Sequence, residues 1–303
     1  MAARMANSPT QVNGAWTIGR LLAWTREHFE THQVDEPRLA AELLLAEALG
    51  CRRIELYARI DHQPTAEQRA VFREHVRAAA EHHPIAYLIG HKEFYSLDFK
   101  VTPDVLIPRP ETELLVERTL AWCRENPQDR YDLLDVGTGS GCIAVTLAKR
   151  EKAAHVVATD RSAAALAVAR ENAVRHGVAD RVQCVTADLL DLPPDCLPRN
   201  GFDVIVSNPP YIGERERASL PRNVVDYEPA DALFSGEDGL DALRGLAGRG
   251  GDKLRRGGLM LVEVGHTQAA AVAAIFVDAG WEPAGRFKDL QGIERALAFR
   301  RPT

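Results

Sequence analysis

Strands and helices are expected to alternate from Tyr131 onward, and this alternation constrains the fold more than any other feature. The run Phe202–Ser207 is apolar along nearly its whole length, which is typical of a buried parallel strand. Such an order predicts an α/β fold with a mostly parallel, doubly wound sheet of seven strands. Because the last two strands lie close together in sequence, we expect them to form an antiparallel hairpin at the sheet edge. Strands are expected at 132–136, 155–159, 182–185, 202–207, 259–264, 281–287 and 295–299, and helices at 143–150, 163–176 and 239–254.

In the first part of the chain the spacing of apolar residues differs from that in the α/β part. Between about residue 16 and residue 83, apolar residues recur at helical spacing and strand signals are few. Pro37 stands where a helix would begin, Gly50 where it would end, and Thr65 with Gln68 fits a capping box. These signals predict a small helical bundle with short connections. We therefore expect a helical domain at 1–84, a linker or β-hairpin at 85–110, and the α/β domain at 111–303.

Composition narrows the classes of partner. The 303 residues carry a net charge of −6, so no overall basic field would attract nucleic acid, although a local basic groove stays open. No apolar run reaches the roughly 20 residues that span a bilayer. Residues 1–15 are small and mostly polar, unlike the apolar centre of a signal peptide. The five cysteines include no Cys-x-x-Cys pair, so we expect no metal site, no disulfide framework and a cytoplasmic location.

A glycine-rich turn follows the first strand of the α/β domain. The segment from Asp135 to Gly141 reads Asp-Val-Gly-Thr-Gly-Ser-Gly, and its glycines would let the backbone approach a ligand closely. The dinucleotide fingerprint requires a further glycine where Cys142 stands, and no Gly-Lys-Ser/Thr follows that would make a phosphate-binding loop. The Asp135 carboxylate can accept from an ammonium group. The candidate cofactor-binding residues of this turn are Asp135, Gly137, Thr138, Gly139, Ser140 and Gly141.

Acidic residues at the next two strand ends extend this pattern. Asp160 lies 23 residues after Gly137, a spacing typical of a carboxylate that holds ribose hydroxyls. Asp188 follows the third strand and can accept from the exocyclic amine of an adenine, while Leu189 can pack on the ring. A ligand with an amino group, a ribose and an adenine, and no required pyrophosphate, is S-adenosylmethionine. We expect this cofactor, with an α/β protein that is not a methyltransferase as the alternative.

Two prolines stop the strand that ends at Ser207. Pro209 and Pro210 cannot donate to a β-ladder, and they hold the chain rigid at a strand end, where ligands bind in open α/β sheets. Asn208 Oδ1 and the Pro209 carbonyl can accept both N–H bonds of a planar amino group while Tyr211 covers its face. A strand followed by a rigid turn is the simpler interpretation of this motif alone. We expect Asn208, Pro209 and Tyr211 to be catalytic, Asn208, Pro209, Pro210 and Tyr211 to bind substrate, and Asn208 also to contact the cofactor.

These motifs together resemble class I S-adenosylmethionine-dependent methyltransferases of the Asn-Pro-Pro-Tyr type. DNA adenine, RNA guanine and protein glutamine amide enzymes share that motif. The stretch from Gly90 to Glu117 narrows the choice, because it is similar to the PrmC/HemK family of peptide-chain release factor glutamine methyltransferases. The resemblance extends from about Ile18 to Phe299 and includes the helical domain. It implies a Rossmann-like class I methyltransferase fold behind a small helical domain.

The resemblance also implies an activity. The methyl group would go to the side-chain amide nitrogen of the glutamine in the Gly-Gly-Gln motif of class I release factors, which the helical domain would dock. Neither a membrane nor direct nucleic-acid binding is then expected. One departure is Leu189, which stands where several relatives carry an aromatic residue against the adenine. The alternatives are a glutamine methyltransferase acting on ribosomal protein L3, a nucleic-acid amino-methyltransferase, and a cofactor-binding module without catalysis.

Three other charged residues are candidates for a place in the site. Arg109 and Glu111 belong to a proline-restricted cluster just ahead of the α/β domain. They are candidate substrate-binding residues, or they brace the linker. Glu263 stands near a strand end and is either a buried acid beside the site or a satisfied carboxylate at the sheet end, of which the second is the expectation.

Overall fold

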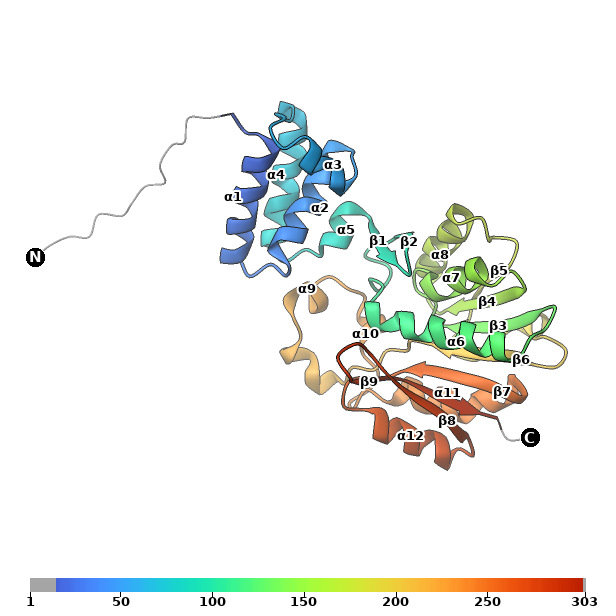
Figure 1. The fold of residues 1–303 in the computed structure, drawn as a ribbon. Helices are drawn as coiled ribbons and strands as arrows, with labels where there is room; N and C mark the ends of the chain where they lie inside the picture. Colours follow the sequence, from blue (N-terminus) through green and yellow to red (C-terminus); the bar gives the residue numbers. More distant parts are fainter. Residues whose placement is uncertain (1–14, 302–303) are drawn as a thin grey trace, which may run out of the picture. The chain divides into compact units, whose positions relative to one another are not determined.

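The computed structural model describes residues 15–301, which fall into two units that meet in sequence between Ile89 and Gly90 (Figure 1). The interpretation of the first residues as a polar start without a signal peptide concerns positions that lie almost wholly outside the described residues. No helix within residues 15–301 has the length and apolar character needed to cross a membrane.

The first unit is a bundle of helices with one apolar core. Gly50 ends its second helix in the left-handed conformation, at a φ of 61°. Thr65 and Gln68 form the expected capping box: the Gln68 backbone N–H donates to Thr65 Oγ1 and the Thr65 backbone N–H donates to Gln68 Oε1. Both sequence signals are therefore confirmed. The helices are α1 (Ile18–Thr31), α2 (Pro37–Leu49), α3 (Arg53–Ala58), α4 (Ala66–Ala80) and α5 (Ile85–Ile89).

The second unit begins with an antiparallel hairpin, β1 (His91–Phe94) and β2 (Leu97–Lys100). Tyr95 and Ser96 join the two strands with φ angles of 52° and 58°. Positive φ at both positions is what a two-residue turn of type I′ requires. The backbone N–H of Tyr95 donates to the Glu113 carboxylate at 2.7 Å, which ties the hairpin to the helix that follows.

A mixed sheet of seven strands forms the centre of the second unit, as expected. Its strand order is β5-β4-β3-β6-β7-β9-β8, and neighbouring strands from β5 to β7 are parallel. Strand β9 is antiparallel to both β7 and β8, so the predicted hairpin at the sheet edge is confirmed. The strands are β3 (Tyr131–Val136), β4 (Ala154–Asp160), β5 (Val182–Thr186), β6 (Phe202–Ser207), β7 (Leu254–Glu263), β8 (Glu282–Lys288) and β9 (Glu294–Arg300).

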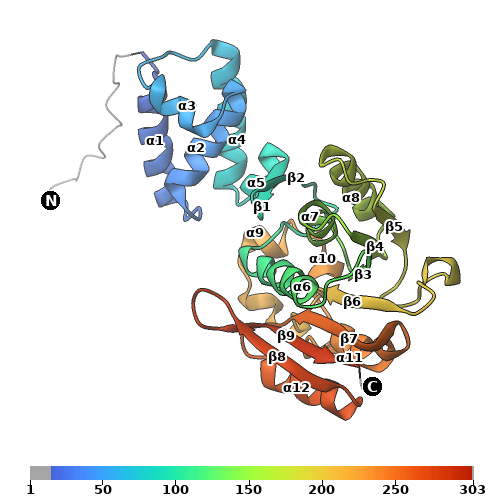
Figure 2. The same ribbon diagram turned by 45° about the vertical axis from the view of Figure 1, so that its right-hand side comes forward.

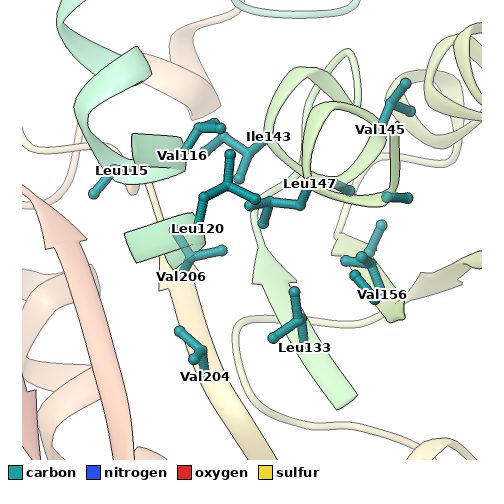
Figure 3. Close-up of a cluster of buried hydrophobic side chains, with 14 of the residues drawn as sticks. Leu115, Val116, Leu120, Leu133, Ile143, Val145, Leu147, Val156, Val204 and Val206 are labelled. Carbon is teal, nitrogen blue, oxygen red and sulfur yellow. The ribbon is translucent and has the colours of Figure 1, made fainter. Parts of the chain in front are cut away.

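Helices cover both faces of this sheet (Figure 2). On one face lie α6 (Glu113–Glu125), α7 (Cys142–Arg150) and α8 (Ala163–Arg175), and on the other lie α11 (Asp241–Arg249) and α12 (Ala269–Asp278). Figure 3 shows the core on the face covered by α6, α7 and α8, in which Leu120 and Leu147 pack against Leu133 and Val204. Burial of these apolar side chains on each face fixes the sheet between the helices.

The helix expected at 239–254 was too long at both ends. Helix α11 ends at Arg249, and the chain passes through a 3-10 turn at Gly250–Asp252 into β7. Gly250 and Gly251 are poor helix formers, because glycine loses the most backbone entropy when it is fixed. Two short helices, α9 (Arg222–Val225) and α10 (Ala230–Leu233), follow β6, and the 3-10 turn η1 (Pro110–Thr112) precedes α6.

The sheet topology sets the place of the site. From β3 the chain winds outward through β4 to β5, and it then returns to β6 on the other side of β3. The carboxyl ends of β3 and β6 are therefore neighbours, with Val136 paired to Ser207. Ser207 Oγ also donates to the Val136 carbonyl at 2.8 Å. The glycine turn and the Asn-Pro-Pro-Tyr motif follow these two ends, at the switch point where open α/β sheets bind ligands.

Candidate active site

The glycine turn after β3 leaves open space on one side. Gly137, Gly139 and Gly141 have φ angles of 72°, 53° and 79°, a region that other residues rarely adopt. A Cβ added at Gly137 or Gly139 would meet no atom within 4 Å, whereas one at Gly141 would lie 3.1 Å from the Ala169 side chain. The first two glycines thus line a cradle, and the third permits close packing of α8.

Asp135 lies beneath this turn with one oxygen left bare. Its side chain is 0% exposed, and its Oδ2 accepts from Thr138 Oγ1 at 2.6 Å and from the Ala144 backbone N–H at 3.1 Å. Its Oδ1 and the nearby Ser140 Oγ are buried without a partner among the described residues. Burial, reinforced by the charge of Asp160, raises the pKa of Asp135 to about 7. A ligand cation reaching Oδ1 would supply the missing partner, as the ammonium group of S-adenosylmethionine can.

The two acids expected at later strand ends occupy different settings. Asp160, at the end of β4, accepts from the Gly139 backbone N–H and from the Ser162 backbone N–H, each at 2.9 Å, so its carboxylate faces the glycine turn. Asp188 follows β5 and is exposed. Leu189 has a φ of 50°, which is uncommon for a residue other than glycine and is found at ligand sites. No hydrogen bond within residues 15–301 joins the Asp188 side chain to the glycine turn.

Asn208 is held by a chain of hydrogen bonds that ends at a buried acid. Asn208 Nδ2 donates to Thr112 Oγ1 at 3.0 Å, and the Thr112 hydroxyl donates to Glu263 Oε2 at 2.6 Å. The Tyr211 hydroxyl donates to the other oxygen, Oε1, at 3.2 Å. Asn208 Oδ1 has no donor among the described residues, so it stays available to a substrate N–H. Pro209 is buried and Pro210 is partly exposed beside it.

Glu263 proves to be both a satisfied carboxylate and a neighbour of the motif. It is 2% exposed, and burial together with the charge of Glu111 raises its pKa to about 7, against the hydrogen bonds from Thr112 and Tyr211 and the charge of Arg295. Burial and the same carboxylate raise the pKa of Tyr211 far above its usual range, so that hydroxyl keeps its proton. The two alternatives for Glu263 are therefore compatible.

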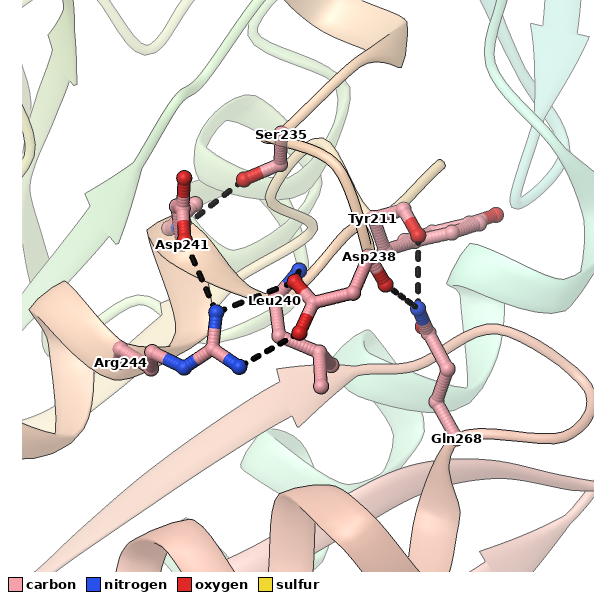
Figure 4. Close-up of polar contacts among 8 residues, drawn as sticks. Tyr211, Ser235, Asp238, Leu240, Asp241, Arg244 and Gln268 are labelled. Atoms are coloured by element: carbon pink, nitrogen blue, oxygen red, sulfur yellow. Dashed lines mark hydrogen bonds and ion pairs between the residues drawn. The ribbon is translucent and has the colours of Figure 1, made fainter. Parts of the chain in front are cut away.

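The backbone after the motif is held by the segment that precedes α11 and by Gln268, which precedes α12 (Figure 4). Gln268 Nε2 donates to the Tyr211 carbonyl at 2.8 Å, and Ile212 makes a parallel bridge with Phe234. Gly239 has a φ of 78°, and a Cβ there would lie 2.2 Å from the Tyr211 carbonyl oxygen. Only glycine fits this close approach of two backbone segments.

Arg109 contacts a carboxylate rather than the Asn-Pro-Pro-Tyr motif. Its guanidinium pairs with Glu228, which is buried and also accepts from the Ile107 backbone N–H at 3.2 Å. Arg109 thus braces the segment ahead of α6, while Glu111 lies close enough to Glu263 to raise its pKa. Sequence reasoning missed the partnership of Thr112, because Thr112 and Glu263 are 151 positions apart and no local pattern links them.

Family models match both units. Residues 20–90 match the PrmC N-terminal domain, and residues 112–227 match the methyltransferase small domain. Among solved structures, the hMettl16 catalytic domain in complex with MAT2A 3'UTR hairpin 6 is similar, with a TM-score of 0.55 and 16% identity, over 69% of this chain and 77% of that one. At this identity the similarity shows the fold alone. The sheet order, with the glycine turn at its switch point, is that of a class I S-adenosylmethionine-dependent methyltransferase.

Curated relatives are similar over almost the whole chain. The release factor glutamine methyltransferase of Rhodopirellula baltica is 42% identical over 291 residues, which are 94% of this chain and 97% of the relative. That of Koribacter versatilis is 42% identical over 278 residues, or 91% and 96% of the two chains. The chain belongs to the release factor glutamine methyltransferase family.

Proposed function

We propose that this protein methylates the side-chain amide nitrogen of the glutamine in the Gly-Gly-Gln motif of class I peptide-chain release factors. The observation that carries the proposal is the fixed Asn208 amide, whose Oδ1 is free beside the cofactor cradle. A primary amide offers two N–H donors in one plane, which suits Asn208 Oδ1 and the Pro209 carbonyl. The family to which the chain belongs supports a release factor as the protein that carries this glutamine.

Catalysis in this proposal is mainly orientation. An amide nitrogen is a poor nucleophile, because its lone pair is delocalised into the carbonyl group. Asn208 Oδ1 and the Pro209 carbonyl accept its two N–H bonds, and Tyr211 packs on the amide plane. The nitrogen then faces the cofactor side of the switch point, and the two oxygens stabilise the positive charge that develops on it. S-adenosylmethionine supplies, when bound, a methyl group on a sulfonium sulfur.

The residues of the cradle fit this cofactor. We assign the bare Oδ1 of Asp135 to its ammonium group and the Asp160 carboxylate to its ribose hydroxyls. Asp188 would accept from the adenine amine, and Leu189 would pack on the ring. Gly137, Thr138, Gly139, Ser140 and Gly141 form the turn that lies against the amino acid part of the cofactor.

The other roles follow from the protein substrate. We assign the helical unit to docking of the release factor, and Arg109 and Glu111 to the substrate side of the site. Arg109 pairs with Glu228, so we propose that it acts by holding the segment that faces the substrate in place. Release factors act on cytoplasmic ribosomes, so we assign the protein to the cytoplasm, with no membrane and no nucleic acid among its partners.

The experiment that tests this function is methyl transfer from tritiated S-adenosylmethionine. Purified release factor, ribosomal protein L3 and DNA are offered separately to the enzyme. We expect labelling of the release factor only, and its loss when the Gly-Gly-Gln glutamine is changed to alanine. Equal labelling of L3 or DNA, or labelling that survives the glutamine change, contradicts the proposal.

A further inference from the structure

Glu263 is a buried acid that the mechanism above does not use. It stands at the last position of β7, and each of its carboxylate oxygens accepts one side-chain hydroxyl. Those hydroxyls belong to Thr112, ahead of α6, and to Tyr211, after β6. Thr112 contacts Asn208, and Tyr211 belongs to the same motif as Asn208, so both segments border the residues proposed to hold the substrate amide. Burying a carboxylate costs folding free energy unless it is hydrogen-bonded, so we ask what the hydrogen bonds of Glu263 do for the site.

The hydrogen bonds at Thr112 have a defined direction. A threonine hydroxyl carries one proton and can donate only once. When Glu263 is ionised, its oxygens can only accept, so the Thr112 proton then points to Glu263 Oε2. The lone pairs of Thr112 Oγ1 then face Asn208 and can only accept. This favours the orientation of the Asn208 amide in which Nδ2 faces Thr112 and Oδ1 faces the substrate.

We infer that Glu263 is a positioning residue for methyl transfer: through the Thr112 hydroxyl it orients the Asn208 amide, and through the Tyr211 hydroxyl it orients the ring. The inference rests on the proposed function, because it assumes that Asn208 Oδ1 accepts from the substrate amide. If the Asn208 amide were turned over, its NH₂ group would face the two N–H donors of the substrate. Donor would then meet donor, and the hydrogen bond that aims the nitrogen would be lost.

The role of the hydroxyl can be separated from that of the side-chain volume. Thr112→Val keeps the shape and removes the donor, while Thr112→Ser keeps the donor. Thr119 is the matched control: it is fully buried in α6, and its hydroxyl donates to the Leu115 carbonyl at 2.8 Å, away from the site. Thr119→Val removes a buried threonine hydroxyl without touching the Glu263 contacts.

We expect Thr112→Val to lower kcat for release factor methylation about 10- to 100-fold, with KM and cofactor affinity within about threefold of wild type. Thr112→Ser restores most of the rate. Thr119→Val lowers the melting temperature but leaves kcat within about twofold. A Thr112→Val enzyme with wild-type kcat overturns the inference, and so does equal loss of kcat in Thr119→Val.

Glu263 itself is tested by a double-mutant cycle. Glu263→Gln keeps the shape, but its amide can turn either an oxygen or an NH₂ group to Thr112, so we expect a loss in kcat of several-fold. Once Thr112→Val has removed the hydroxyl, Glu263→Gln should add less than it does alone, because the two changes interrupt one path. Fully additive losses show that Glu263 does not act through Thr112 and overturn the inference.

A measurement without substrate keeps the two proposals apart. Side-chain amide protons of Asn208, followed by NMR in the cofactor-free protein, should exchange with solvent more slowly in wild type than in Thr112→Val, and Thr112→Ser should restore the protection. If wild-type enzyme fails to label release factor while this protection pattern holds, the proposed function is wrong and the orientation of Asn208 stands. Equal exchange in wild type and Thr112→Val overturns the inference even where labelling is normal.

Discussion

Asp135 and Glu263 are two buried carboxylates at the carboxyl ends of β3 and β7 in the same sheet, and they differ in how their oxygens are hydrogen-bonded. Burial raises the pKa of each to about 7. Asp135 collects both of its donors on Oδ2 and leaves Oδ1 bare, and its partners lie within nine positions along the chain. Glu263 has one donor on each oxygen, supplied by Thr112 and Tyr211 from distant segments.

The difference separates binding from positioning. A buried carboxylate with a bare oxygen is destabilising until a cation arrives, so part of its desolvation cost is recovered only when ligand binds. A carboxylate with both oxygens occupied gains nothing from a ligand and instead fixes the side chains that it holds. In the proposed function Asp135 therefore belongs to the cofactor side of the site, and Glu263 supports the side that receives the methyl group.

The largest effect is expected at Asn208, the side chain that the Glu263 network presents. Asn208→Ala removes the oxygen that we propose accepts from the reacting nitrogen, so turnover should fall about 10³-fold, equivalent to about 4 kcal/mol of transition-state stabilisation. Cofactor affinity, measured by calorimetry, should stay within about fivefold because Asp135 is untouched. Turnover within about tenfold of wild type would contradict the assignment of the acceptor side.

The converse is expected at Asp135. Asp135→Asn keeps the size of the side chain and removes the charge that would pair with the ammonium group, so cofactor affinity should weaken about 100-fold, or about 3 kcal/mol. Glu263→Gln is the matched variant, since it neutralises the other buried carboxylate, and its cofactor affinity should change less than about threefold. Similar losses of affinity in both variants would remove the distinction between the two ends.

Many of the residues around Asp135 could be predicted from sequence, because the contacts of Asp135 are local. Asp135 and Asp160 lie in the last two positions of β3 and β4, the glycine turn follows β3, and the apolar runs of both strands can be recognised in the sequence. Parallel strands bring their carboxyl ends to one edge of the sheet. The fold followed from the same alternation of strands and helices, with a wrong boundary where Gly250 and Gly251 end α11 early.

The Glu263 end could not be predicted in the same way. Thr112 reaches Glu263 across 151 positions, and Tyr211 reaches it across 52, so neither contact leaves a periodic or motif signal. The Asn-Pro-Pro-Tyr motif led us to expect Asn208 to face the substrate, but it did not indicate that Thr112 would hold the Asn208 amide. The partner of Arg109 was hidden for the same reason, since Glu228 lies 119 positions away.

A smaller effect is expected at Gly239, which packs against the backbone of the Asn-Pro-Pro-Tyr motif. Gly239→Ala would place a Cβ 2.2 Å from the Tyr211 carbonyl oxygen, so the Asn-Pro-Pro-Tyr backbone must shift. Gly257 is the control, because it has a φ of 70° but its Cβ would meet nothing within 4 Å, so Gly257→Ala carries backbone strain alone. We expect Gly239→Ala to lower the unfolding free energy by about 2 kcal/mol more than Gly257→Ala does, measured by urea denaturation, and to lower kcat as well. Cofactor affinity should be unchanged in both, and a loss of affinity in Gly239→Ala would show that the two ends are coupled.

The smallest expected effect is the pH dependence of cofactor binding. In the proposed function the ammonium group pairs with ionised Asp135. With a pKa of about 7 in the free protein, that form is mostly absent at about pH 6 and mostly present at about pH 8. Cofactor affinity should therefore rise about tenfold over this interval in wild type and stay flat in Asp135→Asn. The sign is opposite for stability: a carboxyl whose pKa is raised by folding stabilises the protein fully below its unfolded value, and that contribution is lost as the pH rises towards about 7.

Glu263→Gln is a second control for this pH profile, because the pKa of Glu263 is also raised to about 7. Both oxygens of Glu263 already accept hydrogen bonds, so the cofactor affinity of Glu263→Gln should rise with pH as in wild type. A flat profile in Glu263→Gln with a rising profile in Asp135→Asn would reverse the roles of the two acids, because the ammonium group would then depend on the ionisation of Glu263.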